Sequence, residues 1–244
     1  MNRLNEHLWS GIIHRSETGE SREEDKCEIQ RRLDKGEEPE SIFSFPMVEL
    51  EQGYMKVCIR SNDDRVYNIL DTSKNRLVWQ KETDSWFWGI LPFNNDFWQV
   101  CKGWDIDDVN LMDKKGNLLS DIWFYDIDQF NKNNIAKVQK KTSTTRKYNF
   151  IDTKGKLIWD KPIDEWFDGV KYAKDVYEYS SGFIRVKRND KFNFIDLNGN
   201  LLWNKPDKDW FDDANIFLND HSAVYLNGNW KYLDTKGNLH NEKP

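Results

Sequence analysis

The sequence is poor in several features that would assign it to a protein class. No apolar run approaches the ~18 residues of a membrane-spanning helix, and no signal-type apolar block follows residues 1–6. The 3 cysteines, Cys27, Cys58 and Cys101, are odd in number and widely spaced. This spacing indicates reduced thiols rather than a disulfide framework. We therefore expect a cytoplasmic protein with no membrane partner.

Motifs that carry catalysis are also missing. The chain has no Gly-x-Ser-x-Gly elbow and no Cys-x-x-Cys or His-x-x-x-His pair, and Gly155-Lys156 lacks the rest of a phosphate-binding loop. The turns that begin at Asp113 and Asp196 have some calcium-loop character but lack the later bidentate acid. No nucleophile–base pair or paired-acid set emerges. We predict a protein that is not an enzyme and that has no cofactor and no metal.

An excess of basic charge is absent as well. The net charge is −6, and residues 1–42 hold 11 acidic and 7 basic residues. The remainder, with 31 acidic and 29 basic residues, is nearly neutral. Nucleic-acid recognition requires a basic excess on one face, so nucleic acid is not an expected partner.

What the sequence does contain is a repeat rich in aromatic residues. An aromatic segment ends in aspartate, a turn with glycine follows in most copies, and four copies continue to a Trp-Phe pair. The aspartates are separated by 42, 39, 44 and 38 residues, a period typical of repeat architectures. The five anchors are Asp71, Asp113, Asp152, Asp196 and Asp234.

Each copy has the pattern of antiparallel strands. Apolar and polar residues alternate in 183–187 and 222–225, and Asp152 to Gly155 has the composition of a tight turn. Three or four strands in about 40 residues match a propeller blade. We predict a mainly β domain over 43–244, in which five β-meander repeats form a propeller-like ring and Phe43 and Phe45 supply a closing strand. The alternative is an open superhelix of β-hairpins.

Residues 1–42 differ from the repeats. Leu4, Leu8 and Ile12 follow helical spacing, and Ser21 with Glu24 forms a capping-box pattern before a second helix that ends near Gly36. We predict a helical segment that either caps one end of the repeats or reaches a partner as an arm.

The repeats resemble the WG-repeat family, most specifically at Asp152–Ile158, although Asn68, Asn110, Asn149, Asn193 and Lys231 stand where that family has glycine. The resemblance implies a binding scaffold. It also implies a similarity to immunity proteins that bind bacterial toxins, including those of contact-dependent growth inhibition.

Partner contacts are expected where the sequence departs from the repeat. The pairs of tryptophans seven residues apart, such as Trp79 and Trp86, recur in register and indicate packing between blades. Tryptophans outside that register and nearby acids are the candidate partner-binding residues: Trp88, Trp98, Trp104, Asp105, Asp107, Asp108, Asp126 and Asp128. The leading hypothesis is a non-enzymatic immunity protein that blocks a basic, nuclease-type toxin. A small-molecule or glycan-binding propeller is the alternative, and an enzyme is the third hypothesis.

Overall fold

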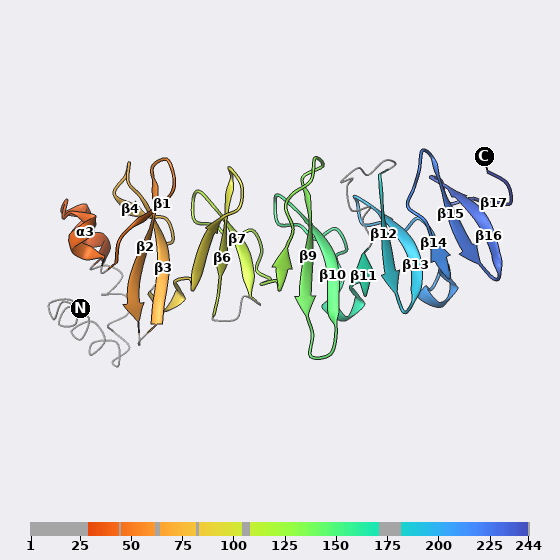
Figure 1. The fold of residues 1–244 in the computed structure, drawn as a ribbon, viewed down its shortest axis with the longest axis horizontal. Helices are drawn as coiled ribbons and strands as arrows, with labels where there is room; N and C mark the ends of the chain where they lie inside the picture. Colours follow the sequence, from red (N-terminus) through yellow and green to blue (C-terminus); the bar gives the residue numbers. More distant parts are fainter. Residues whose placement is uncertain are drawn as a thin grey trace. The chain divides into compact units, whose positions relative to one another are not determined.

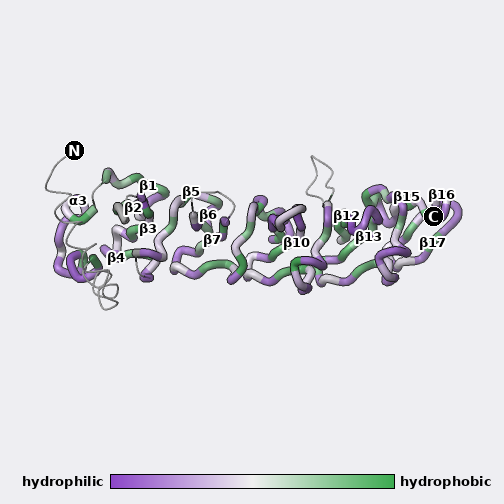
Figure 2. Tube along the Cα trace, turned by 90° about the horizontal axis from the view of Figure 1, so that it is seen from below, coloured by the Kyte–Doolittle hydropathy of each residue, from purple (hydrophilic) through white to green (hydrophobic). Residues whose placement is uncertain are grey.

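The computed structural model describes residues 29–43, 45–61, 64–81, 83–103, 108–170 and 182–243, and it is mainly β. The chain divides into two compact units, and the boundary in the sequence falls between Trp123 and Phe124. Five antiparallel sheets are each built from strands of one repeat (Figure 1). Hydrophobic residues recur through both units (Figure 2). Among the described residues, no helix combines the length and apolar character needed to cross a bilayer.

The first unit contains two sheets. The first sheet has the order β1 (Val48–Glu51), β2 (Tyr54–Ser61), β3 (Asp64–Asp71) and β4 (Arg76–Leu77). The second has the order β5 (Gly89–Pro92), β6 (Phe97–Cys101) and β7 (Val109–Asp113). Residues 29–34 are helical, followed by the short helix α3 (Pro39–Ile42), and the 3-10 turn η1 (Thr83–Ser85) lies between the sheets in sequence.

The second unit contains three sheets in the same meander order. The third sheet comprises β8 (Asp126–Ile127), β9 (Ile135–Lys141) and β10 (Arg146–Asp152), and the fourth β11 (Gly169–Val170), β12 (Phe183–Arg188) and β13 (Lys191–Asp196). The fifth comprises β14 (Asp213–Ala214), β15 (His221–Leu226), β16 (Asn229–Asp234) and β17 (Leu239–His240). The 3-10 turns η2 (Ile163–Glu165) and η3 (Asp207–Asp209) precede the buried Trp-Phe pairs. The predicted five β-meander repeats are confirmed, and none of these sheets closes on itself in the described chain.

The aspartate at the end of each repeat strand organises the following turn, as predicted. Oδ1 of Asp196 accepts hydrogen bonds from the backbone amides of Asn198 at 2.9 Å and Asn200 at 2.8 Å. Gly199 occupies the left-handed region at φ +87°, which costs glycine little and other residues more. Asp113, Asp152 and Asp234 make the same pair of bonds two and four residues ahead.

Successive repeats within a unit pack face to face. We call the side of a sheet that meets the preceding repeat its leading face, and the opposite side its trailing face. Ile135 and Phe150 on the trailing face of the third sheet share a core with four residues of the next repeat: Ile184, Val186, Ile195 and Trp210. A Cβ atom added to Gly199 would lie 2.2 Å from the carbonyl oxygen of Ile158. Glycine in this turn therefore permits close contact between the two repeats.

A buried asparagine links the strand that ends at the anchor aspartate to the segment around the tryptophan that follows it. Asn149 is fully buried, its Nδ2 donates to the Trp159 carbonyl at 2.8 Å, and its Oδ1 accepts from the amides of Phe150 at 2.8 Å and Trp159 at 3.1 Å. Asn68 and Asn193 make the same three bonds, and Asn110 bonds equivalent backbone groups. The side chain satisfies backbone groups that water does not reach.

Residues 29–43 cover the leading face of the first sheet. Ile29, Leu33, Ile42 and Phe43 are buried in one cluster with strand residues such as Val57. Asn75 stands where later turns have glycine, at φ 50°, and its Nδ2 donates to the Leu33 carbonyl at 2.7 Å. A side chain fits at this turn because a helix, rather than a repeat, precedes it.

The prediction that Phe43 and Phe45 complete the last sheet is wrong. Neither residue belongs to a strand, and Phe43 packs in the core of the first unit. The fifth sheet takes its fourth strand, β17, from its own repeat. The helix predicted around Leu4, Leu8 and Ile12 lies outside the described residues, and the boundary between residues 42 and 43 stays a prediction.

Candidate functional site

Two of the predicted partner-binding residues lie together in the first unit. The backbone amide of Trp88 donates to the carbonyl of Cys101 at 2.9 Å, and Lys102 donates to the carbonyl of Asp108 at 2.8 Å. Trp88 and Asp108 are half-buried, and they lie at the end of the second sheet where β6 ends and β7 begins. Three other residues of the prediction, Trp104, Asp105 and Asp107, fall between these strands in sequence but outside the described residues.

Trp98 has a different environment from the one predicted. Its side chain is 1% exposed, in edge-to-face contact with Tyr54 at 5.0 Å. The Lys114 ammonium lies 3.8 Å from its ring centroid and pairs with Glu51. Burial lowers the pKa of Lys114, whereas the adjacent carboxylate favours the charged form. Trp98 is therefore a core residue, and this burial removes it from the partner-binding surface.

The two predicted acids of the second unit differ in availability. Asp126 is exposed, and its Oδ1 accepts a hydrogen bond from the amide of Ile127 at 3.0 Å. Asp128 is half-buried, with an ion pair to Lys137 at 2.9 Å. Because Lys137 neutralises Asp128, Asp126 is the stronger candidate for attracting a basic partner.

Further exposed acids occupy equivalent turns of consecutive repeats. We call Asp164, Glu165 and Asp209, which lie on η2 and η3, the acidic corner row; all three are exposed. Glu165 and Asp209 give the second unit exposed negative charge at the same position in two repeats, whereas exposed Lys208 occupies the position of Asp164.

The aspartates just after the Trp-Phe pairs are used structurally instead. Asp168 pairs with Lys147 at 2.5 Å and accepts from the amide of Asn189, in the hairpin of the next repeat, at 2.8 Å. Burial by itself raises the pKa of Asp168, but the bonds from Lys147 and Asn189 outweigh it and lower the pKa. Asp212 makes the equivalent pair with Lys191.

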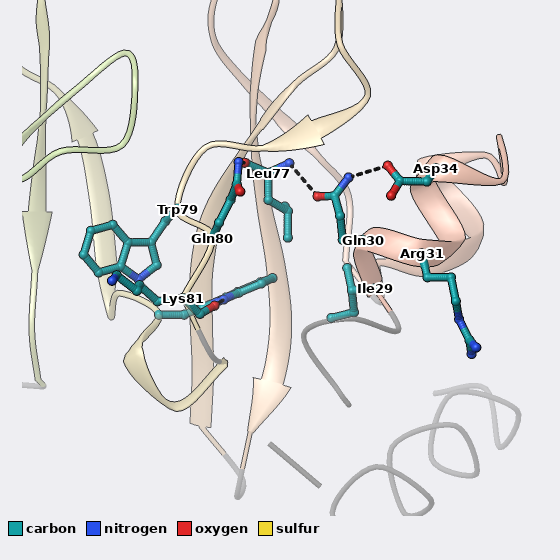
Figure 3. A pocket seen from close by; sticks show the side chains of 9 residues that line it. Ile29, Gln30, Arg31, Asp34, Leu77, Trp79, Gln80 and Lys81 are labelled. Atoms are coloured by element: carbon teal, nitrogen blue, oxygen red, sulfur yellow. Dashed lines mark hydrogen bonds between the residues drawn. The ribbon is translucent and has the colours of Figure 1, made fainter. Parts of the chain in front are cut away.

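A pocket of about 220 Å³ opens in the first unit between helical residues 29–34 and the outer edge of the first sheet (Figure 3). Apolar lining comes from the helix, from β4 and from the tryptophan pair of this repeat, and charged or amide groups complete it. The lining residues are Ile29, Gln30, Arg31, Asp34, Leu77, Trp79, Gln80, Lys81 and Trp86.

Hydrogen bonds hold the polar side of this pocket. Gln30 Oε1 accepts from the amide of Leu77 at 3.3 Å, and its Nε2 donates to Asp34 at 2.9 Å (Figure 3). Trp86 is 3% exposed, whereas Trp79 is half-buried. The pocket thus offers an indole and apolar surface beside charged groups, which suits an amphipathic side chain or a small ligand.

The described residues of the two units show no arrangement for a metal ion and no activated thiol. Among the described residues, no group of three or more His, Cys, Asp or Glu is arranged to hold an ion. Cys58 and Cys101 are buried free thiols whose pKa values are raised by burial. A raised pKa disfavours the thiolate, which is the nucleophilic form.

Sequence reasoning missed the pocket and the buried asparagines. The pocket arises because residues 29–34 occupy the place of a preceding repeat, and no motif marks that replacement. The asparagines did carry a signal, since they recur at one position of four repeats. That signal identifies a structural role only once the bonds to the tryptophan segment are known.

No protein-family model matches the chain, and no curated protein matches it. Among solved structures, the chain is similar to regucalcin, a calcium-binding protein from Agrobacterium tumefaciens, at 12% identity and TM-score 0.27 over 80% of this chain and 71% of that one. It is similar to Hsv2p of Kluyveromyces lactis at 13% identity and TM-score 0.30, over 78% and 61% of the respective chains. TolB from Acinetobacter baumannii gives 9% identity and TM-score 0.26, over 80% and 53%. Similarities at TM-scores this low support no functional argument.

Proposed function

We propose that this chain is a non-enzymatic, protein-binding immunity protein that blocks a basic, nuclease-type bacterial toxin in the cytoplasm. The observation that supports the proposal is the acidic corner row, which repeats exposed carboxylates on η2 and η3. The basic catalytic cleft of the toxin would bind this negative row, because complementary charge accelerates association and adds specificity. The WG-repeat resemblance supplies the toxin as the kind of partner.

Each unit, taken by itself, also offers further candidate contacts. Exposed Asp126 adds to the negative charge of the second unit. Trp88 and Asp108, with the sequence-predicted Trp104, Asp105 and Asp107, provide a candidate contact in the first. Tryptophan at the centre of an interface contributes more binding energy than rim charges do.

The test pairs the chain with a candidate basic, nuclease-type toxin domain. Bacteria that express the toxin should survive only when the chain is co-expressed. Converting the three corner-row acids to lysine brings the net charge from −6 to about zero. We expect the association rate to fall on the order of ten-fold or more at low salt, and the salt dependence to flatten.

Single substitutions provide the matched comparison. Glu165→Lys should slow association, whereas Asp96→Lys changes the charge equally at an exposed site of the first unit and should have a smaller effect. Failure to protect cells would contradict the immunity function. Protection with unchanged kinetics in the triple variant would instead remove the acidic corner row from the interface.

A second candidate function is small-molecule or glycan binding, which the pocket beside Trp79 favours. Indole faces stack on sugar rings and other flat ligands, and the charged groups around the pocket fix orientation. A glycan array followed by Trp79→Ala tests this function. Saturable binding that Trp79→Ala abolishes, with no protective activity against the toxin, would favour this candidate.

The proposed arrangement of the repeats is a propeller-like ring or an open superhelix. The leading face of the first sheet is occupied by residues 29–43, which supports the open superhelix. Small-angle X-ray scattering distinguishes the two by the maximum dimension of the particle.

A further inference from the structure

Arg188, at the end of β12, joins the two turns that carry the acidic corner row. Its Nη2 donates to the carbonyl of Glu165 on η2, and its Nη1 donates to Oδ2 of Asp207 on η3 at 3.4 Å. The turn η2 belongs to the third repeat and η3 to the fourth. One side chain therefore bridges the corner turns of consecutive repeats within the second unit.

Aromatic rings enclose the guanidinium of Arg188. Its Cζ atom lies 5.3 Å from the ring centroid of Trp159, 5.1 Å from that of Phe167 and 5.5 Å from that of Trp210. Arg188 is 8% exposed, and its Nε has no hydrogen-bond partner among the described residues. The cation–π contacts are favourable, but burying a charge with an unpartnered N–H group is costly. We therefore expect an apolar residue of similar size to give an equally stable fold.

Other sheets show that the repeat does not require a cation at this position. The strand registers place Ile59 of the first sheet and Leu226 of the fifth sheet where Arg188 stands in the fourth. Ile59 is 1% exposed and packs in one core with Trp86, the counterpart of Trp210. An aliphatic residue can therefore fill this position beside the corner tryptophan.

The contact from Arg188 to η2 has no counterpart at η3. The carbonyl of Glu165 accepts a hydrogen bond from Nε1 of Trp159 at 3.1 Å as well as the bond from Arg188. The equivalent carbonyl of Asp209 accepts from Nε1 of Trp203 at 3.2 Å, and the fifth sheet presents an aliphatic side chain where a second donor would stand. The arginine thus adds a fixed position of η2 relative to η3, which the fold alone does not supply.

We propose that Arg188 is a positioning residue, which fixes η2 and η3 relative to each other so that Glu165 and Asp209 form one preorganised acidic surface for a basic partner. This inference rests on the proposed binding function. Groups that are fixed before association lose less conformational freedom on binding, and this difference appears mainly in the dissociation rate. The exposed carboxylates supply the long-range attraction, whereas Arg188 stabilises the bound complex.

The first test measures the two turns without any partner. Nitroxide labels on Asp164→Cys and Lys208→Cys, in a Cys27→Ser background, report the distance between η2 and η3 by pulsed electron–electron double resonance. The two remaining cysteines are buried free thiols. We expect a narrow distance distribution with Arg188 and a broader one in Arg188→Leu. An equally narrow distribution in Arg188→Leu would overturn the proposal.

The second test separates positioning from charge, in binding kinetics with a candidate basic, nuclease-type toxin domain. Arg188→Leu makes the second unit more negative, so an effect of charge alone would accelerate association with a basic partner. Positioning predicts instead that the dissociation rate rises by about ten-fold. Lys154→Leu is the matched control, because it removes one positive charge from an exposed turn of the same unit and should leave the dissociation rate unchanged.

Urea unfolding shows whether Arg188→Leu remains folded, and its midpoint should equal or exceed that of the wild type. Arg188→Met replaces this variant if the leucine variant is unstable. A wild-type chain that does not bind the toxin domain would contradict the proposed function, while the distance measurement would still decide whether Arg188 fixes the turns. An unchanged dissociation rate in Arg188→Leu, or an equal rise in Lys154→Leu, would overturn the positioning role in binding.

Discussion

A substitution at Gly199 tests how the repeats pack, and Gly228 provides its matched control. Both glycines lie in the left-handed region, at φ +87° and φ +83°. A Cβ atom at Gly199 would lie 2.2 Å from the carbonyl oxygen of Ile158, whereas a Cβ at Gly228 meets no atom within 4 Å. Alanine therefore imposes the same backbone strain at both sites but a collision only at Gly199.

Two separate costs set the expected magnitudes. An L-residue in the left-handed conformation costs about 1–2 kcal/mol, which applies to both variants. At Gly199 the turn must also retreat by about 1 Å from a backbone carbonyl, and overpacking of this kind costs a further ~1–3 kcal/mol. We expect Gly228→Ala to destabilise by about 1–2 kcal/mol and Gly199→Ala by about 2–5 kcal/mol.

Urea unfolding followed by circular dichroism at neutral pH measures both values. Equal destabilisation of the two variants would refute the reasoning, since the contact with Ile158 would then contribute nothing. A larger effect of Gly228→Ala would refute it as well.

The polar groups inside each repeat give two further stability predictions. Asn149→Ala removes three hydrogen bonds and leaves the amides of Phe150 and Trp159 without this acceptor, whereas the Trp159 carbonyl keeps its bond from the Lys161 amide. It should cost about 2–5 kcal/mol in urea unfolding, against less than about 0.5 kcal/mol for exposed Asn204→Ala. Similar values for both variants would contradict the role of the asparagine. Burial raises the pKa of Asp196, but hydrogen bonds from Asn200 and nearby amides outweigh it, so the folded-state pKa lies below the ordinary value. Its contribution to stability is present above the unfolded pKa of about 3.9 and is lost as the pH falls through the lower folded value. Asp196→Asn should therefore make unfolding stability less dependent on pH below about 4, and an unchanged pH dependence would argue against this assignment.

The sequence predicts the repeats well because their signals are local. The period, the alternation along strands and the aspartate–glycine turns each depend on residues close together in the chain, and the structure confirms them. Asp196 and Gly199, for example, have the predicted bonds and conformation.

The candidate site is less predictable because it depends on which faces are covered. Trp98 breaks the repeat register, which suggested an exposed contact, yet Tyr54 from β2 and Lys114 from the turn after β7 enclose it. Trp79 and Trp86 fit the register, but Trp79 lines a pocket because a helix precedes the first sheet. The position of a side chain within the repeat does not by itself determine whether that side chain is exposed. Its exposure depends on which helix, strand or turn packs against it.

One β module, fixed internally by a buried asparagine, recurs along the chain. Hydrogen exchange of amides resolved by nuclear magnetic resonance tests this recurrence most directly. We predict that the amides that donate to these asparagines, at Ile69, Leu111, Phe150 and Phe194, exchange slowly and at comparable rates. Fast exchange at these amides, or protection that does not recur at the four positions, would contradict a shared module.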